Sequence, residues 1–126
     1  MVLHQRFQDF VLFLYVHMAL CDGSIHISEE QVILDKMTKL FPTESDHKKK
    51  LEHALTEYKT LEPSMVAAII RDSFKFFDKV TFSQKYKIYT DMYDVVNADG
   101  KVEESEKTAL VELKEIIDLN SEIRQS

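Results

Sequence analysis

Hydrophobic residues along this chain recur every three to four positions, which is the spacing of helices that bury one face. Segments with this spacing lie at about residues 4–21, 28–41, 45–59, 63–77 and 83–96. A sixth surrounds Leu110–Ile117 and precedes a polar tail at 120–126. No segment alternates apolar and polar residues as a half-buried strand would. The pattern predicts an all-α fold, a compact bundle of six or seven helices, with residues 1–126 as a single domain.

The first predicted helix is apolar on all sides, which is typical of a helix at the centre of a bundle. Capping residues and prolines mark the ends of other predicted helices. Ser28, three residues before Gln31, fits a capping box, and Pro42 cannot continue that helix. Pro63 suits the first turn of a helix, and we expect Ser83 to cap the next one.

One motif occurs twice, at Asp22–Glu29 (DGSIHISE) and at Asp99–Glu106 (DGKVEESE). The copies align without a gap at an offset of 77 residues, and each follows an apolar helical segment. In each, an Asp-Gly turn is followed by a β-branched residue and then by a Glu seven positions after the Asp. We therefore expect two repeated helix–Asp-Gly turn–helix units that present acidic residues at equivalent corners.

The motif differs from a calcium-binding EF-hand. An EF-hand loop has ligands at positions 1, 3 and 5, Gly at 6 and Glu at 12. Here the Asp falls at position 5 and the Glu at 12, but position 1 would be Met18 or Val95. Apolar side chains cannot coordinate calcium, so neither copy is an ordinary EF-hand.

The two turns, with the order of helices around them, resemble the TerB-like family. These helical domains are named for tellurite-resistance proteins and also occur at the N-terminus of a membrane-anchored DnaJ co-chaperone. The resemblance implies an all-helical domain, acidic residues that hold a divalent cation, and a connection with stress responses. Family members often have Ser or Thr four residues after the Asp, where this chain has His26 and Glu103.

The second copy is the more acidic. Asp94 precedes it and Asp91 lies one turn before Asp94, and a cation could offset the repulsion between these like charges. We expect a weak site for calcium or magnesium there and a weaker site at the first copy. The structural alternative is that the Asp-Gly pairs only end helices and the glutamates only interact with helix dipoles. The candidate metal ligands are Asp22, Glu29, Asp94, Asp99, Glu103 and Glu106.

Composition limits the classes of function. The net charge of −6 argues against a nucleic-acid partner, because nucleic-acid binding depends on basic patches. The apolar run at 10–20 is shorter than the roughly 20 residues that a membrane span requires, so we expect no membrane insertion.

Cys21 is the only cysteine, which is typical of an intracellular protein, and we expect a cytoplasmic one. His17, Cys21 and His26 supply only three of the four usual ligands of a structural zinc.

No catalytic motif is present, since the sequence has no glycine-rich phosphate loop, no His-Glu-x-x-His and no nucleophile elbow. We expect a non-enzymatic binding or scaffold module of stress responses with a protein partner. The alternative is a pure protein–protein interaction domain in which the turn acids are only structural.

Overall fold

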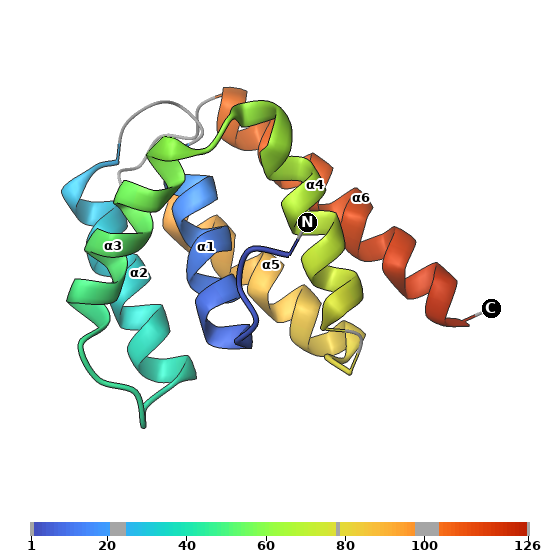
Figure 1. Ribbon diagram of the computed structural model, residues 1–126, viewed down its shortest axis with the longest axis horizontal. Helices are drawn as coiled ribbons and strands as arrows, with labels where there is room; N and C mark the ends of the chain where they lie inside the picture. Colours follow the sequence, from blue (N-terminus) through green and yellow to red (C-terminus); the bar gives the residue numbers. More distant parts are fainter. Residues whose placement is uncertain (1, 21–24, 78, 98–103, 126) are drawn as a thin grey trace.

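The computed structural model describes residues 2–20, 25–77, 79–97 and 104–125, without the side chains of Phe82 and of residues 116–125. These residues form six helices and no strand, which confirms the all-α prediction. The helices, shown in Figure 1, are α1 (Phe7–Leu20), α2 (Ile27–Leu40), α3 (His47–Thr60), α4 (Pro63–Phe76), α5 (Phe82–Val96) and α6 (Glu104–Gln125).

Helix α1 is the centre of the fold. Ten of its 14 residues are buried, among them residues on every side of the helix. It packs against α2, α3, α5 and α6, and Figure 1 shows it enclosed by its neighbours. A helix without a polar face is stable only when other helices cover it all round. The central position predicted from its sequence is therefore confirmed.

Helix α4 packs against α6 and is tied to α1 by aromatic rings. The ring of Phe74 meets the ring of Phe10 edge-on at 5.1 Å between centroids, and Phe77 stacks on Phe10 at 5.6 Å. Phe7 adds a further edge contact to Phe77 at 5.4 Å. Such pairs contribute about 0.5–1.5 kcal/mol each beyond the area they bury. Phe76, on the opposite side of the helix, is 50% exposed.

Two predicted helix caps were wrong by two residues. Helix α2 begins at Ile27, so Ser28 lies inside it, and His26 is the capping residue. The backbone N–H of His26 donates to Glu29 Oε1 at 3.0 Å, so the reciprocal bond involves Glu29 rather than Gln31. Helix α5 is capped by Thr81, which exchanges two hydrogen bonds with Gln84 in place of the expected Ser83 cap.

The helix limits also differ at the ends of the chain. Helix α1 begins at Phe7 rather than near His4, and α6 continues to Gln125 through most of the segment expected to be a polar tail. A polar sequence can remain helical because Glu, Lys, Gln and Arg have good helix propensity. Within the described residues, no helix is both long enough and apolar enough to cross a membrane.

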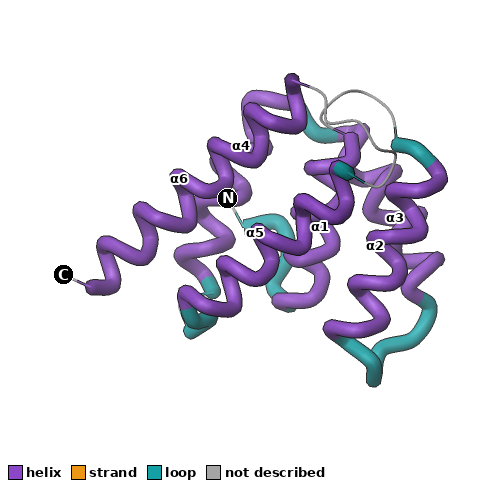
Figure 2. Tube along the Cα trace, turned by 180° about the vertical axis from the view of Figure 1, so that it is seen from behind, coloured by secondary structure: helices purple, strands orange, loops and turns teal. Residues whose placement is uncertain are grey.

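Both Asp-Gly pairs lie between consecutive helices, Asp22-Gly23 between α1 and α2 and Asp99-Gly100 between α5 and α6. The pairs themselves fall outside the described residues. The four helix ends that flank them lie toward the same end of the molecule, as the two opposite views in Figures 1 and 2 show. The fold therefore brings the starts of α2 and α6 to one end of the bundle.

His17 is the one strongly polar residue in the second half of α1. Its Nδ1 lies 2.7 Å from the hydroxyl of Tyr58 on α3, and the two rings are 5.8 Å apart. Burial lowers the pKa of His17 from 6.5 to about 4. The imidazole is therefore neutral at physiological pH and serves as a hydrogen-bonded member of the α1–α3 contact.

The cap of α5 can be tested with two neighbouring variants. Thr81→Ala removes a side chain that accepts from the N–H of Gln84, and it should lower the free energy of unfolding by about 1 kcal/mol. Ser83→Ala, at the residue expected from the sequence, should change it by less than about 0.5 kcal/mol. Urea unfolding measures both. An equal loss in the two variants would contradict the assignment of Thr81.

His17 should make the stability of the protein depend on pH. Its folded pKa lies below its unfolded pKa, so the unfolded state takes up the proton first as the pH falls. The stabilisation is complete above about pH 6.5 and is lost toward pH 4. Between pH 7 and pH 5 the free energy of unfolding should fall by about 2 kcal/mol through this residue.

Urea unfolding at pH 7 and pH 5 measures this loss. His17→Gln should remove the corresponding part of the difference, whereas His53→Gln, at an exposed position on α3, should retain it. The same pH difference in all three proteins would show that His17 has no part in it.

Candidate metal site

Two of the predicted ligands, Glu29 and Glu106, occupy equivalent places in their helices. Glu29 is the third residue of α2 and Glu106 the third residue of α6. Both are buried, with exposed fractions of 1% and 2%. A carboxylate in the first turn interacts favourably with the partial positive charge of the helix N-terminus. The sequence repeat thus corresponds to a buried acid at the start of each helix that follows an Asp-Gly pair.

Glu29 also has a structural role. One of its carboxylate oxygens, Oε1, accepts the hydrogen bond from the N–H of His26 described above. This bond satisfies one of the N–H groups that a helix leaves without an internal partner at its start. The geometry of Glu29 accordingly agrees with the capping interpretation as well as with the metal-binding one.

The remaining predicted ligands are placed only in part. Asp22, Asp99 and Glu103 lie outside the described residues, as does Cys21. Asp94 lies on α5, where its Oδ2 atom is 2.5 Å from Nζ of Lys36 on α2. Its counterpart in the first copy, His17, contacts Tyr58 instead, so the two equivalent positions have different surroundings.

Lys36 joins two acids of α5. Besides Asp94, its ammonium group contacts Oδ1 of Asp91 at 3.2 Å, and Lys87 contacts the other oxygen of Asp91 at 3.3 Å. Hydrogen bonding to Asp94, and then to Asp91, raises the pKa of Lys36. Asp91 is only 6% exposed, so the pair with Lys36 compensates a carboxylate that is largely out of water.

Tyr15 of α1 lies against the same acids and is fully buried. Burial raises the pKa of its hydroxyl, and the charges of Asp91 and Asp94 raise it further. A hydrogen bond between this hydroxyl and Asp91 also contributes to the raised pKa of Tyr15. We name Tyr15, Lys36, Asp91 and Asp94 the α5 acid cluster. Lys36 and Asp91 are 55 residues apart, so their contact could not be predicted from the spacing of residues along the chain.

The described residues do not by themselves complete a metal site. Among residues 2–20, 25–77, 79–97 and 104–125, no group of three or more His, Cys, Asp or Glu side chains is arranged to hold a metal ion. A cation at the end of the molecule where α2 and α6 begin would therefore need oxygen atoms from the turn segments as well as Glu29 or Glu106.

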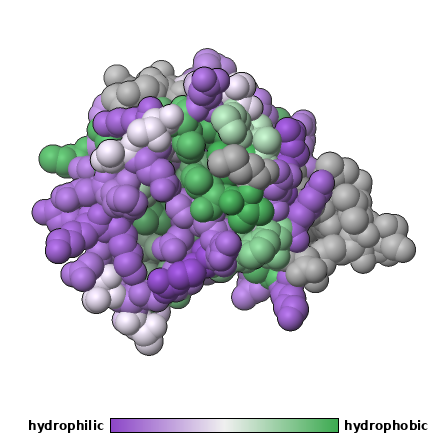
Figure 3. Space-filling view, in the orientation of Figure 1, coloured by the Kyte–Doolittle hydropathy of each residue, from purple (hydrophilic) through white to green (hydrophobic). Residues whose placement is uncertain are grey.

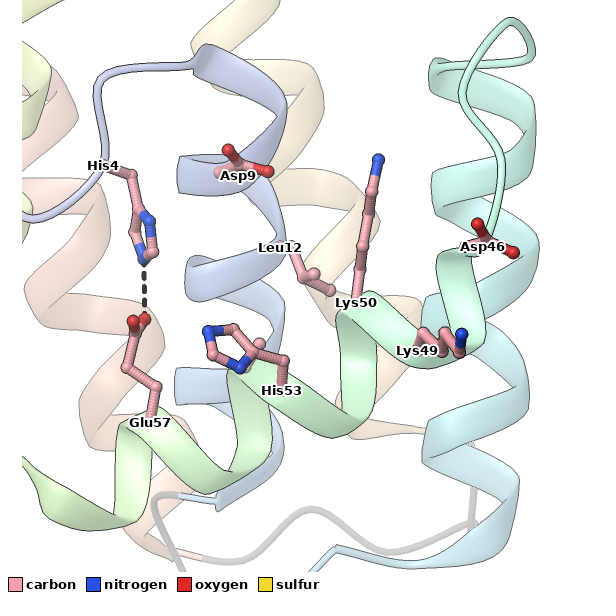
Figure 4. A pocket seen from close by; sticks show the side chains of 9 residues that line it. His4, Asp9, Leu12, Asp46, Lys49, Lys50, His53 and Glu57 are labelled. Carbon is pink, nitrogen blue, oxygen red and sulfur yellow. Dashed lines mark ion pairs between the residues drawn. The ribbon is translucent and has the colours of Figure 1, made fainter.

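A groove between α1 and α3 has a volume of about 460 Å³ and was not predicted from the sequence. Its walls have charges of both signs, from Asp9 of α1 and from Lys49 and Lys50 of α3 (Figure 4). At one end His4 Nε2 contacts Glu57 Oε1 at 3.0 Å. Lys50 also contacts Glu44 at 2.9 Å, so part of the basic run at 47–50 is paired within the protein.

Comparison with curated proteins gave no match, and comparison with solved structures gave none. The family model described as "Tellurite resistance protein TerB" matches residues 8–126. The match includes all six helices apart from the first residue of α1, and it includes both Asp-Gly segments. The all-helical fold and the match over nearly the whole chain lead to one conclusion: this protein belongs to the TerB family.

Proposed function

We propose that this protein is a non-enzymatic binding or scaffold module of a stress response, and that it holds a divalent cation at its repeated turns. The ion is calcium or magnesium. Its ligands come from Asp94, Asp99, Glu103 and Glu106 at the second turn and, more weakly, from Asp22 and Glu29 at the first. Membership of a family named for tellurite resistance supports the connection with stress.

The observation that carries the proposal is the pair of buried glutamates at the same helix position. Glu29 and Glu106 lie 77 residues apart, each three residues into a helix, and both helices begin toward the same end of the molecule (Figure 1). Carboxylate oxygens are the ligands that calcium and magnesium take in proteins. A cation would also offset the repulsion between the like charges of the acidic second copy.

The alternative is a protein-interaction domain in which these acids only stabilise helix starts. The hydrogen bond from His26 to Glu29 favours it, because it gives Glu29 a structural purpose. Apolar surface between α3 and α4, visible around the N-terminal segment in Figure 3, would suit a protein partner. Only the first of these two functions requires a bound cation, so a metal titration distinguishes between them.

Calcium or magnesium should raise the melting temperature of the protein, because a ligand that binds only the folded state stabilises it. At ten times the Kd the gain is about 1.4 kcal/mol, or a rise of about 5 °C in a chain of this size. Glu106→Gln should abolish most of the rise. Glu104→Gln, two residues earlier and exposed, should retain it. Scanning calorimetry with and without metal measures the shift.

Two results would contradict the proposal. One is the absence of any melting shift or heat of binding up to millimolar calcium and magnesium. The other is an equal loss of the shift in Glu104→Gln and Glu106→Gln, which would indicate general screening of negative charge rather than a site.

A further inference from the structure

Residues 2–6 form a short segment that precedes α1 and lies across it beside α3 (Figure 1). We call this segment the N-terminal strap. Its Leu3 packs against the hydrophobic core, and the ring of His4 lies 5.8 Å from the ring of Phe13 on α1. Phe13 is only 2% exposed, so the strap helps to cover an aromatic part of the core.

Two acids hold the strap in place. Nε2 of His4 is 3.0 Å from Oε1 of Glu57 on α3 (Figure 4). The guanidinium group of Arg6 donates a hydrogen bond to Oε1 of Glu44, which lies between α2 and α3. Lys50 contacts the other oxygen of Glu44 at 2.9 Å. Hydrogen bonding, chiefly to Lys50, lowers the pKa of Glu44 to about 2, so this carboxylate keeps its charge at physiological pH.

The contacts of the strap show what kind of segment this place binds. We name Phe13, Glu44 and Glu57 the strap surface. It is an aromatic floor flanked by two carboxylates, and its occupant at 3–6 is an apolar residue followed by basic residues one and three positions later. The side chain of Arg6 is 54% exposed and that of Glu57 is 28% exposed. Exposed pairs of this kind contribute little to stability, so the strap can leave without unfolding the protein.

We propose that the strap surface is a docking site for a partner protein that presents a segment of the same pattern, and that residues 3–6 occupy the site in the free protein. The net charge of −6 favours a partner with basic residues, because complementary charges steer association. A tethered strap competes at an effective concentration of roughly millimolar, so the partner must displace it in order to bind. The contacts of His4 and Arg6 therefore set the affinity for the partner.

This inference extends the proposed function, because it gives the binding module a class of partner. It rests on the proposed function only for the existence of a partner, since no residue of the strap surface is among the proposed metal ligands. Its test is made in a chelator, without calcium or magnesium. Failure of this test would leave the cation proposal unaffected, and failure of the metal titration would leave the strap surface unaffected.

The test uses the full chain and a fluorescent peptide with the sequence of residues 2–8, and fluorescence anisotropy measures binding. The double variant His4→Ala/Arg6→Ala loses both polar contacts of the strap, and it should bind the peptide about tenfold more tightly than the unchanged protein. Gln5→Ala, at an exposed strap residue, should bind the peptide as the unchanged protein does. Equal affinity of the double variant and the unchanged protein would overturn the proposal.

Further substitutions in the double variant locate the bound peptide. Glu44→Gln and Glu57→Gln should each weaken binding about threefold, because each removes one charge that the peptide contacts. Glu52→Gln, at an exposed position on α3, should leave binding unchanged. A peptide in which His4→Glu and Arg6→Glu reverse the charges should not bind. Equal binding of the two peptides, or no effect of either acid of the strap surface, would overturn the docking site.

Circular dichroism establishes that the double variant remains helical. If it does not, Arg6→Ala alone replaces it, because Arg6 lies outside the helices and is largely exposed. The single variant should bind the peptide about threefold more tightly than the unchanged protein. The absence of any gain in this folded variant would overturn the proposal.

Discussion

The burial of most of α1 is the constraint on which the rest of this structure depends. A 14-residue helix without a polar face must be covered on every side, and four other helices provide that cover. Once α2 and α5 lie beside α1, the chain must leave α1 and α5 near the same end of the bundle. Helices α2 and α6 follow these two helices along the chain, so the packing of an apolar helix decides where Glu29 and Glu106 lie.

The charges of the protein are arranged around this core in two different ways. Glu29 and Glu106 lie at the starts of helices, where the aligned backbone dipoles favour a negative charge. Asp91 instead lies in the body of α5, where no helix end assists it, and Lys36 compensates its charge from the neighbouring helix. Breaking such a buried pair is usually costly, since it leaves one charge without a partner. The α2–α5 contact is therefore electrostatic as well as apolar.

The sequence was sufficient for the fold class, the order of the helices and the central place of the first one, because each depends on hydrophobic spacing. Helix starts were less predictable. Ser28 and Ser83 are good capping residues, yet His26 and Thr81 occupy the cap positions of α2 and α5. The capping preference of a single residue is a weak predictor of where a helix begins when a nearby residue can also cap it.

Contacts between distant residues could not be predicted at all. Three of these contacts depend on how helices pack in three dimensions. They join Lys36 to Asp91, Tyr15 to Asp91, and His17 to Tyr58. Of the repeated motif, the equal placement of Glu29 and Glu106 could be foreseen from the alignment of the copies. The differing surroundings of His17 and Asp94 could not, because one faces α3 and the other α2.

The central claim is that the acids of the second turn hold a cation and that those of the first turn hold one more weakly. The most direct measurement is the set of backbone amide shifts in a nuclear magnetic resonance titration of the full chain with calcium or magnesium. The account predicts saturable shifts concentrated at 21–29 and 91–106, with the larger changes in the second range. Shifts spread evenly over exposed acids of α2, α3 and α6, or none at all, would contradict it.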